Sequence, residues 1–231
     1  HPSFLAHDTG DYHPERPDRL RAVLAALDDA AIAHLVSVVA PAATLEQLVR
    51  VHPKEYVEAI LGVRPPPGEL VQIDADTIMS TESAEAARHA AGAVVAGVDA
   101  VMRDAAQTVF AAVRPPGHHA LPSIPGGFCL FNSVAVGALH AQAVYGLERV
   151  AIVDFDVHHG QGTQAIVEAD PRLFYASSHQ SPLYPGTGSA RRTKSASGSS
   201  MKRWMARRSG RAPMAGSQPF SASHSRALGS S

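Results

Sequence analysis

"RVAIVDFDVHHG", residues 149–160, is the stretch that decides the fold. An apolar, β-prone run ends in two acids one residue apart, and two adjacent histidines follow. In an extended chain alternate side chains share a face, so Asp154, Asp156 and His158 lie on one side. A carboxylate and an imidazole two residues apart can converge on one divalent cation, which offsets the cost of burying their charge. The stretch therefore predicts a buried strand that ends in a metal site.

The segments around this stretch alternate between helical and strand patterns. Buried strands that alternate with helices indicate an α/β fold whose parallel sheet is covered by helices on both faces. A Pro-rich loop is expected at 64–77. Apolar periodicity predicts helices at 13–30, 52–63, 80–102, 132–144 and 160–170. Short β-rich runs predict strands at 108–113, 149–156 and 173–179.

A second polar cluster follows the strand expected at 108–113 and ends in His118 and His119. Because ligands of open α/β sheets bind beyond the carboxyl ends of the strands, both clusters are expected to face one pocket. The histidine pair would move protons for a metal-activated water. The alternative, that both histidines only bond backbone carbonyls of their loop, stays open. A mononuclear site needs at least three protein ligands; Asp156 and His158 supply two, so a third must come from elsewhere.

The bulk composition describes one medium-large globular domain. The chain has 231 residues, of which 45% are hydrophobic and 18% charged, with a net charge of −1. This balance gives no general attraction to nucleic acid or to an anionic membrane, and no apolar stretch is long enough to span a bilayer. The single cysteine, Cys129, excludes a disulfide framework. We therefore expect a cytoplasmic protein with neither a nucleic-acid nor a membrane partner.

The composition changes near residue 190. From Ala190 to the end the chain has nine Lys or Arg, eleven Ser and no Asp or Glu. No apolar periodicity continues there, so we predict a folded domain over 1–189 and a basic Ser/Arg-rich tail over 190–231, disordered or translated out of frame. A nucleic-acid-binding arm is the alternative, but such arms usually keep Lys and Arg in a patterned cluster.

Five ordered motifs resemble those of the histone deacetylase superfamily. They are "HPERPDRL", "RPPGHHA", "GGFCLFN", "VDFDVHHGQGTQ" and "LYPGTG". The resemblance is strongest to its bacterial and class II-like branches, which include acetylpolyamine amidohydrolases. It implies the three-layer arginase–deacetylase fold with a central parallel sheet, incomplete here at the C-terminus. It also implies zinc-dependent hydrolysis of acyl amides, with acetyl-lysine proteins or acetylpolyamines as substrates.

The resemblance assigns roles to the residues of the two clusters. Asp156 and His158 would be zinc ligands. His118 and His119 would be the tandem pair beside the zinc-bound water, with His119 as the general base. Asp154 would be the buried acid that orients His118.

Further roles follow from the same resemblance. Gly127, Phe128 and Tyr184 would line the acyl-lysine tunnel. Arg16 would line the inner acetate pocket, and Asp74 would lie at the rim and hold the substrate backbone. A structural potassium ion would be surrounded, mostly through backbone oxygens, by Asp154, Asp156, His158, Ser177 and Ser178.

Two departures from the family pattern bear on activity. Gln161 stands where the family usually has Asn or Asp. The third zinc ligand, a later Asp, and a tyrosine in a Gly-rich stretch have no counterpart, because the last acid is Asp170 and all five tyrosines precede residue 190. We therefore expect a deacetylase by descent with weak or no turnover. The alternatives are a non-catalytic metal-binding remnant and a dinuclear ureohydrolase, which would need more carboxylates; a homo-oligomer stays open.

Overall fold

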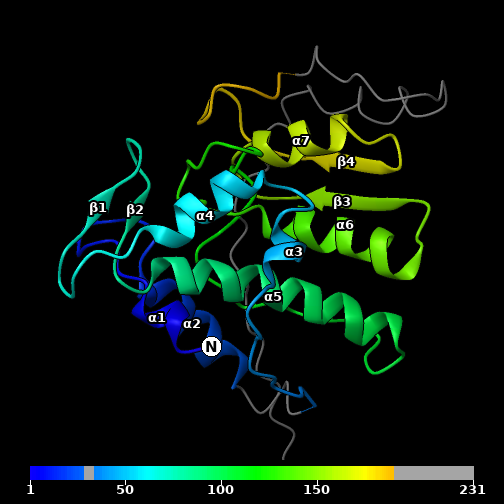
Figure 1. Ribbon diagram of the computed structural model, residues 1–231, viewed down its shortest axis with the longest axis horizontal. Helices are drawn as coiled ribbons and strands as arrows, with labels where there is room; N and C mark the ends of the chain where they lie inside the picture. The colour runs from blue at the N-terminus through cyan, green and yellow to red at the C-terminus, as the bar shows by residue number, and fades with distance from the viewer. Residues whose placement is uncertain (29–33, 190–231) are drawn as a thin grey trace, which may run out of the picture. The chain divides into compact units, whose positions relative to one another are not determined.

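The computed structural model describes residues 1–28 and 34–189 (Figure 1). The predicted tail at 190–231 lies outside these residues, and the boundary at residue 189 stays a prediction. The helices are α1 (Ser3–Ala6), α2 (Pro17–Leu27), α3 (Leu45–Leu48), α4 (Lys54–Gly62), α5 (Ser83–Met102), α6 (Ser133–Tyr145) and α7 (Gln161–Glu168). The strands are β1 (Val71–Gln72), β2 (Ile78–Met79), β3 (Val150–Asp154) and β4 (Leu173–Ser177). None of the helices in this part of the chain has the length and apolar character needed to span a bilayer.

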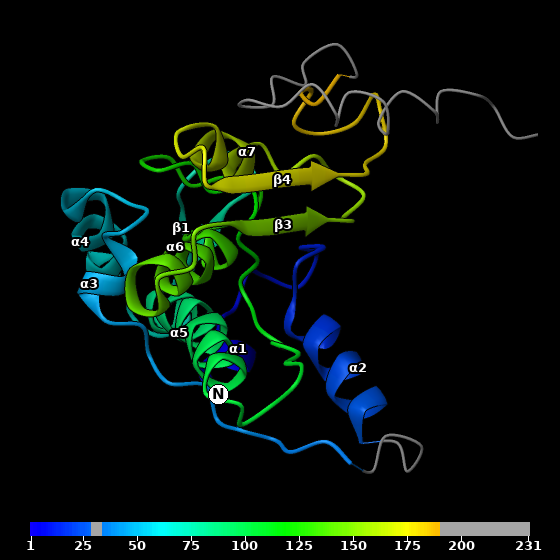
Figure 2. The same cartoon turned by 90° about the vertical axis from the view of Figure 1, so that its right-hand side faces the viewer.

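The strands β3 and β4 form a parallel pair, as the sequence predicts. Val150 lies opposite Leu173, and the register continues to Asp154 opposite Ser177. Figure 2 shows the two strands side by side and pointing the same way. The parallel pairing places the ends of both strands, where the polar cluster begins, at one edge of the sheet.

Helices cover one face of this pair. Ile152 and Leu173 are buried there against Ala138 of α6 and Val167 of α7. On the other face the side chain of Val153 is 68% exposed. The predicted helical cover of the second face is therefore not found within residues 1–28 and 34–189.

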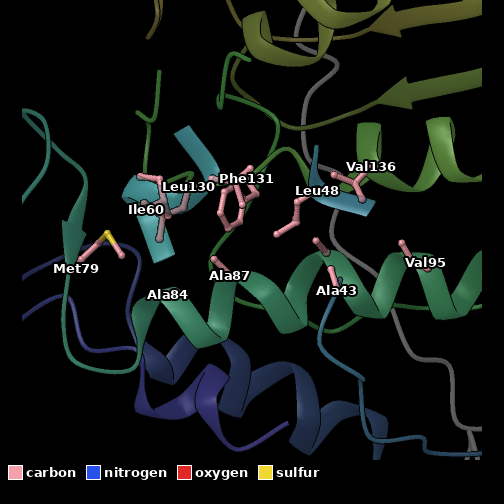
Figure 3. Packing of buried hydrophobic residues seen from close by; sticks show 12 residues of the cluster. Ala43, Leu48, Ile60, Met79, Ala84, Ala87, Val95, Leu130, Phe131 and Val136 are labelled. Carbon is pink, nitrogen blue, oxygen red and sulfur yellow. The ribbon is translucent and has the colours of Figure 1, made fainter. Parts of the chain in front are cut away.

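The main core lies between α5, α6 and the segments that cross them. Small residues of α5 such as Ala87 let neighbouring chain approach, and Phe131 and Leu48 fill the space above the helix (Figure 3). The approach is closest at Gly92 of α5, where a Cβ atom would overlap the backbone at 41–43. Figure 1 shows α5 running beneath α6 and above α1 and α2. The predicted helix at 80–102 thus forms the centre of the described fold.

Two sequence predictions differ from the structure. The segment 108–113, predicted as a strand, forms no strand and joins no sheet within the described residues. Val109 and Phe110 are 48% and 67% exposed, because no neighbouring strand covers them or pairs with their backbone. The loop predicted at 64–77 contains β1, which pairs antiparallel with β2. Two hydrogen-bonded residues in a strand are too few to leave an alternation signal.

A buried ion pair anchors the loop that carries the histidines. The Arg114 guanidinium donates to the two carboxylate oxygens of Glu15, from Nε at 2.6 Å and from Nη2 at 2.8 Å. Its Nη1 donates to the carbonyl oxygens of Phe4 at 2.6 Å and His7 at 3.1 Å. The side chains of Arg114 and Glu15 are only 4% and 1% exposed. These bonds therefore fix Arg114, where the histidine loop begins, against the N-terminal segment.

Candidate active site

His118 is held by a carboxylate at the end of β3. Its Nδ1 lies 2.9 Å from Oδ2 of Asp154, and the hydroxyl of Tyr175 donates to the same oxygen at 2.8 Å. Burial opposes ionisation of Asp154, but the bonds from His118 and Tyr175 outweigh it and lower the carboxyl pKa. An ionised Asp154 requires Nδ1 of His118 to carry a proton. The other ring nitrogen, Nε2, is 3.9 Å from Oδ1 of Asp156.

His119 is a neutral imidazole. Its Nδ1 donates to Oε1 of Gln161 at 2.7 Å, and the Gln161 amide donates back to the His119 carbonyl at 3.3 Å. Burial, followed by the neighbouring charge of His118, lowers the pKa of His119 to about 4. The ring is therefore uncharged at neutral pH, with Nε2 able to accept a proton. The longer side chain of Gln161, compared with the Asn or Asp of the family pattern, still reaches Nδ1.

Asp156 and His158, the two predicted metal ligands, lie against each other. Oδ1 of Asp156 accepts from the His158 backbone N–H at 2.7 Å and lies 3.1 Å from His158 Nδ1. Tetrahedral zinc ligands at about 2.0–2.1 Å from the ion lie roughly 3.3 Å apart, so these two atoms fit neighbouring positions of one centre. Their side chains are 48% and 34% exposed. The donors therefore face solvent on the side of His118.

The donor set is incomplete in the part of the chain that the structure describes. Among residues 1–28 and 34–189, no group of three or more His, Cys, Asp or Glu side chains is arranged to hold a metal ion. Structural and catalytic zinc sites use at least three protein ligands. Asp156 and His158 therefore stay the two predicted ligands within these residues, and their role as ligands stays a prediction.

Tyr184 lies beside the histidines. Its ring meets the His119 ring edge-on at a centroid distance of 4.9 Å, and the His158 ring at 6.2 Å. Gly127 lies on the other side of His119, where a Cβ atom would overlap the imidazole. Phe128 follows with φ of 69° and packs edge-on against His13 at 4.8 Å. Of the three residues predicted to line a tunnel, Tyr184 and Gly127 therefore lie against His119, and Phe128 follows Gly127 and packs on His13.

The turn between β1 and β2 forms an acidic rim. Asp76 Oδ1 accepts from the Gly127 backbone N–H at 3.0 Å, and Thr77 Oγ1 accepts from that of Phe128 at 3.1 Å. Asp74, the predicted rim residue, lies beside Gly126. Burial, then the charges of Asp76 and Asp74, raises the pKa of Tyr184 to about 12. The carboxylates therefore border the tyrosine side of the site.

The remaining predicted residues divide into two groups. The residues assigned to a potassium site lie together at the strand ends, where the Ser178 N–H donates to the Asp154 carbonyl at 3.0 Å and Ser177 lies opposite Asp154. Arg16 is not brought to the site. Its side chain is 51% exposed and pairs with Asp18 at 3.3 Å. The reason is local: Glu15 turns inward to Arg114, so the next side chain of the extended backbone turns outward.

Several residues that hold the candidate site in place were not predicted from the sequence. Tyr175 bonds Asp154, and Asp76 and Thr77 hold the backbone of the Gly127–Phe128 turn. A signal existed for Tyr175, since it alternates with buried Leu173 and its hydroxyl needs a buried partner. The three oxygen-bearing side chains of "DADT" were a weaker signal. Their partners are set only by tertiary contacts.

Known proteins share this sequence and fold. The family described as the histone deacetylase domain matches residues 13–216. An uncharacterized protein of Synechocystis is 44% identical over 81% of this chain and 62% of its own length. A probable deacetylase of Archaeoglobus fulgidus is 39% identical over 81% of this chain and 52% of its own length.

A solved structure gives the same result. The crystal structure of the HDA15 HD domain is 39% identical, with a TM-score of 0.75 over 82% of this chain and 57% of that one. This likeness confirms the predicted arginase–deacetylase fold. The chain spans between 52% and 62% of the length of these three proteins. The chain belongs to the histone deacetylase family.

Proposed function

We propose that this chain is a zinc-dependent amidohydrolase that removes acetyl groups from acetyl-lysine or acetylpolyamine substrates. The observation that carries the proposal is the histidine pair: each ring has its Nδ1 bonded to a side-chain oxygen, of Asp154 or of Gln161, and so presents Nε2. The donors Asp156 and His158 lie beside this pair. Membership of the histone deacetylase family supports the same chemistry.

Each side chain has a role in the proposed reaction. Asp156 and His158 would hold the zinc ion, which when bound supplies Lewis acidity toward an amide carbonyl and a water molecule. His119, neutral because its pKa is lowered to about 4, accepts a proton at Nε2 as general base. Asp154 stabilises the protonated ring of His118, so His118 can hold a proton and donate it to the leaving amine.

The surroundings of the site support a slender substrate. Tyr184 and Phe128 offer apolar ring surface for an alkyl chain, and Asp74 and Asp76 add negative charge at the rim. Both substrate classes offer the alkyl chain; an acetylated lysine side chain is neutral, whereas an acetylated polyamine keeps positive charge on its other amines and so also suits the acidic rim. We also propose that backbone oxygens at the ends of β3 and β4, where the Ser178 N–H donates to the Asp154 carbonyl, hold a structural potassium ion, as oxygen-rich sites do for hard cations.

Metal analysis and an acetate-release assay on the full chain test the proposal. We expect bound zinc and slow turnover of an acetylated lysine peptide or of an acetylated polyamine that stops on addition of a chelator. His158→Ala should lose most of the zinc and all of the turnover. The matched control is His34→Ala, which removes an exposed histidine outside the site.

Each result has a defined meaning. Zinc binding that depends on His158 without any turnover would contradict the enzyme proposal and favour a non-catalytic metal-binding protein. Unchanged zinc content in His158→Ala would contradict the assignment of the ligands.

A further inference from the structure

Two histidines that the proposed reaction does not use fasten the loop that carries Tyr184. His159 Nδ1 lies 2.8 Å from Thr187 Oγ1, and His159 Nε2 lies 2.6 Å from Gln164 Oε1. His179 Nε2 lies 2.9 Å from the Gly188 carbonyl oxygen. The two rings are tilted against each other with a centroid distance of 4.7 Å. We name this group, His159 and His179 with Thr187 and Gly188, the histidine clamp.

The partners determine which ring nitrogen carries the proton. A carbonyl oxygen only accepts, so His179 donates from Nε2 to Gly188 and accepts at Nδ1 from the Ser177 hydroxyl at 2.7 Å. Gln164 donates its amide to Glu168 at 2.8 Å, which fixes its Oε1 as the acceptor for His159 Nε2. His159 Nδ1 must then accept from the Thr187 hydroxyl.

Gly188 packs directly against both rings of the histidine clamp. Gly188 has φ of 80°, a conformation that glycine adopts readily and other residues rarely. A Cβ atom there would overlap both clamp rings, His179 and His159. The side chain of His159 is buried, with 3% exposure of the residue. The backbone of the loop therefore lies directly on the two imidazoles.

The clamp closes the loop around Tyr184. At its start, the Gln180 N–H donates to the Val157 carbonyl at 2.9 Å; inside it, Gly186 N–H donates to Leu183 O at 2.8 Å. The clamp holds the other end. Tyr184 therefore lies in a short segment fixed at both ends, and its ring is set against His119 at 4.9 Å.

We propose that His159 and His179 are positioning residues that hold Tyr184 against His119 and thereby set how tightly an acyl substrate binds. The part that concerns substrate rests on the proposed deacetylase function. The part that concerns the loop does not, because it follows from hydrogen bonds within the chain.

Thr187→Val tests the clamp, and Thr187→Ser is its matched control. Thr187 is exposed, so neither change disturbs the core. Valine keeps the shape but lacks the hydroxyl that His159 needs, whereas serine keeps the donor. Loss of one hydrogen bond corresponds to about a threefold to tenfold change in an equilibrium. We expect amide hydrogen exchange in residues 181–189 to quicken by that factor in the valine variant and to stay at the parent rate in the serine variant.

Two further measurements separate positioning from general stability. Nitrogen-15 spectra of the histidine rings in the full chain should show the Nε2-protonated form for both His159 and His179. With an acetyl-lysine peptide, the valine variant should raise KM about threefold to tenfold with little change in kcat, because binding contact rather than proton transfer is lost. The serine variant should restore the parent KM.

The outcomes are distinguishable. Equal exchange in the parent and in Thr187→Val, or an Nδ1-protonated His159, would overturn the clamp. Faster exchange with an unchanged KM would overturn its role in substrate binding. A parent chain without any turnover would overturn the proposed function alone, and the exchange and ring spectra would still decide whether the clamp exists.

Discussion

Replacing Glu15 by glutamine tests the ion pair that anchors the histidine loop. Glutamine keeps the shape of glutamate but removes the charge that balances the Arg114 guanidinium. The carboxylate accepts two guanidinium bonds, at 2.6 Å and 2.8 Å, and both side chains are less than 5% exposed. The variant therefore leaves a buried cation without its partner. Removing one member of such a pair costs about 3–5 kcal/mol of unfolding free energy.

The size of this effect is large compared with the stability of a domain. Folded domains are stable by about 5–15 kcal/mol, so Glu15→Gln would remove about a third to a half of the total for a domain in the middle of this range. Asp18→Asn provides the contrast, because Asp18 pairs with Arg21 at 2.7 Å but with side chains 60% and 59% exposed. An exposed pair contributes only about 0–1 kcal/mol.

Urea unfolding followed by far-UV circular dichroism at neutral pH measures both variants. A double-mutant cycle with Arg114→Met should give a coupling energy of about 1–3 kcal/mol, since the two residues share their bonds. Arg114→Met also frees the carbonyls of Phe4 and His7, so it should not be neutral on its own. If Glu15→Gln lowered the unfolding free energy no more than Asp18→Asn, the reasoning about the buried pair would be refuted.

Three further predictions follow from other parts of the fold. Burial lowers the pKa of His52 from 6.5 to about 4. Its contribution to the free energy of unfolding is therefore complete above pH 6.5 and is lost as the pH falls toward 4. His52→Gln should reduce the change in unfolding free energy over this pH range by up to about 3 kcal/mol, and an unchanged slope would disprove this. Gly92→Ala should lower the melting temperature, because its Cβ would overlap backbone atoms, at a cost of about 1–3 kcal/mol or more. Gly62→Ala, with nothing within 4 Å, should be neutral or stabilising, and the same effect for both variants would contradict the packing argument. Asp154→Asn should slow the proposed deacetylation about tenfold to a hundredfold and Tyr175→Phe less, because only the first removes the carboxylate that orients His118; equal rates would exclude that role.

The elements that the sequence predicted well are those with a long or strong periodic signal. The helix at 80–102 carries five turns of apolar pattern, and the structure confirms it as α5. The parallel pairing of β3 and β4 followed from a helical segment between two apolar runs, and α7 provides that crossover. The segment 108–113 has an equally strong β pattern, yet a strand exists only where a neighbour accepts its hydrogen bonds. Pattern alone does not supply that neighbour.

The candidate site was predictable where it depends on strand ends and unpredictable where it depends on loop partners. Asp154 was found because it ends the strand β3, and His118 does reach it, although from a segment that joins no sheet within the described residues. The contact between Asp76 and the Gly127 backbone joins residues 51 positions apart and leaves no local pattern. Arg16 was assigned to a pocket by motif position, but its direction is decided by whether Glu15 is buried.

The site consists of a rigid half and an exposed half. Gly160 approaches so closely that a Cβ atom would overlap both Asp154 and the His118 ring, and one at Gly127 would overlap the His119 ring. Backbone thus packs directly against both rings of the histidine pair His118 and His119, and their hydrogen bonds to Asp154 and Gln161 orient each ring. The donors differ, because Asp156 and His158 are 48% and 34% exposed and bond mainly to each other. The fold therefore sets the geometry of the histidine pair, whereas the predicted metal donors Asp156 and His158 would be held in place only by a bound ion. Removal of zinc should loosen Asp156 and His158 and leave His118 and His119 in place.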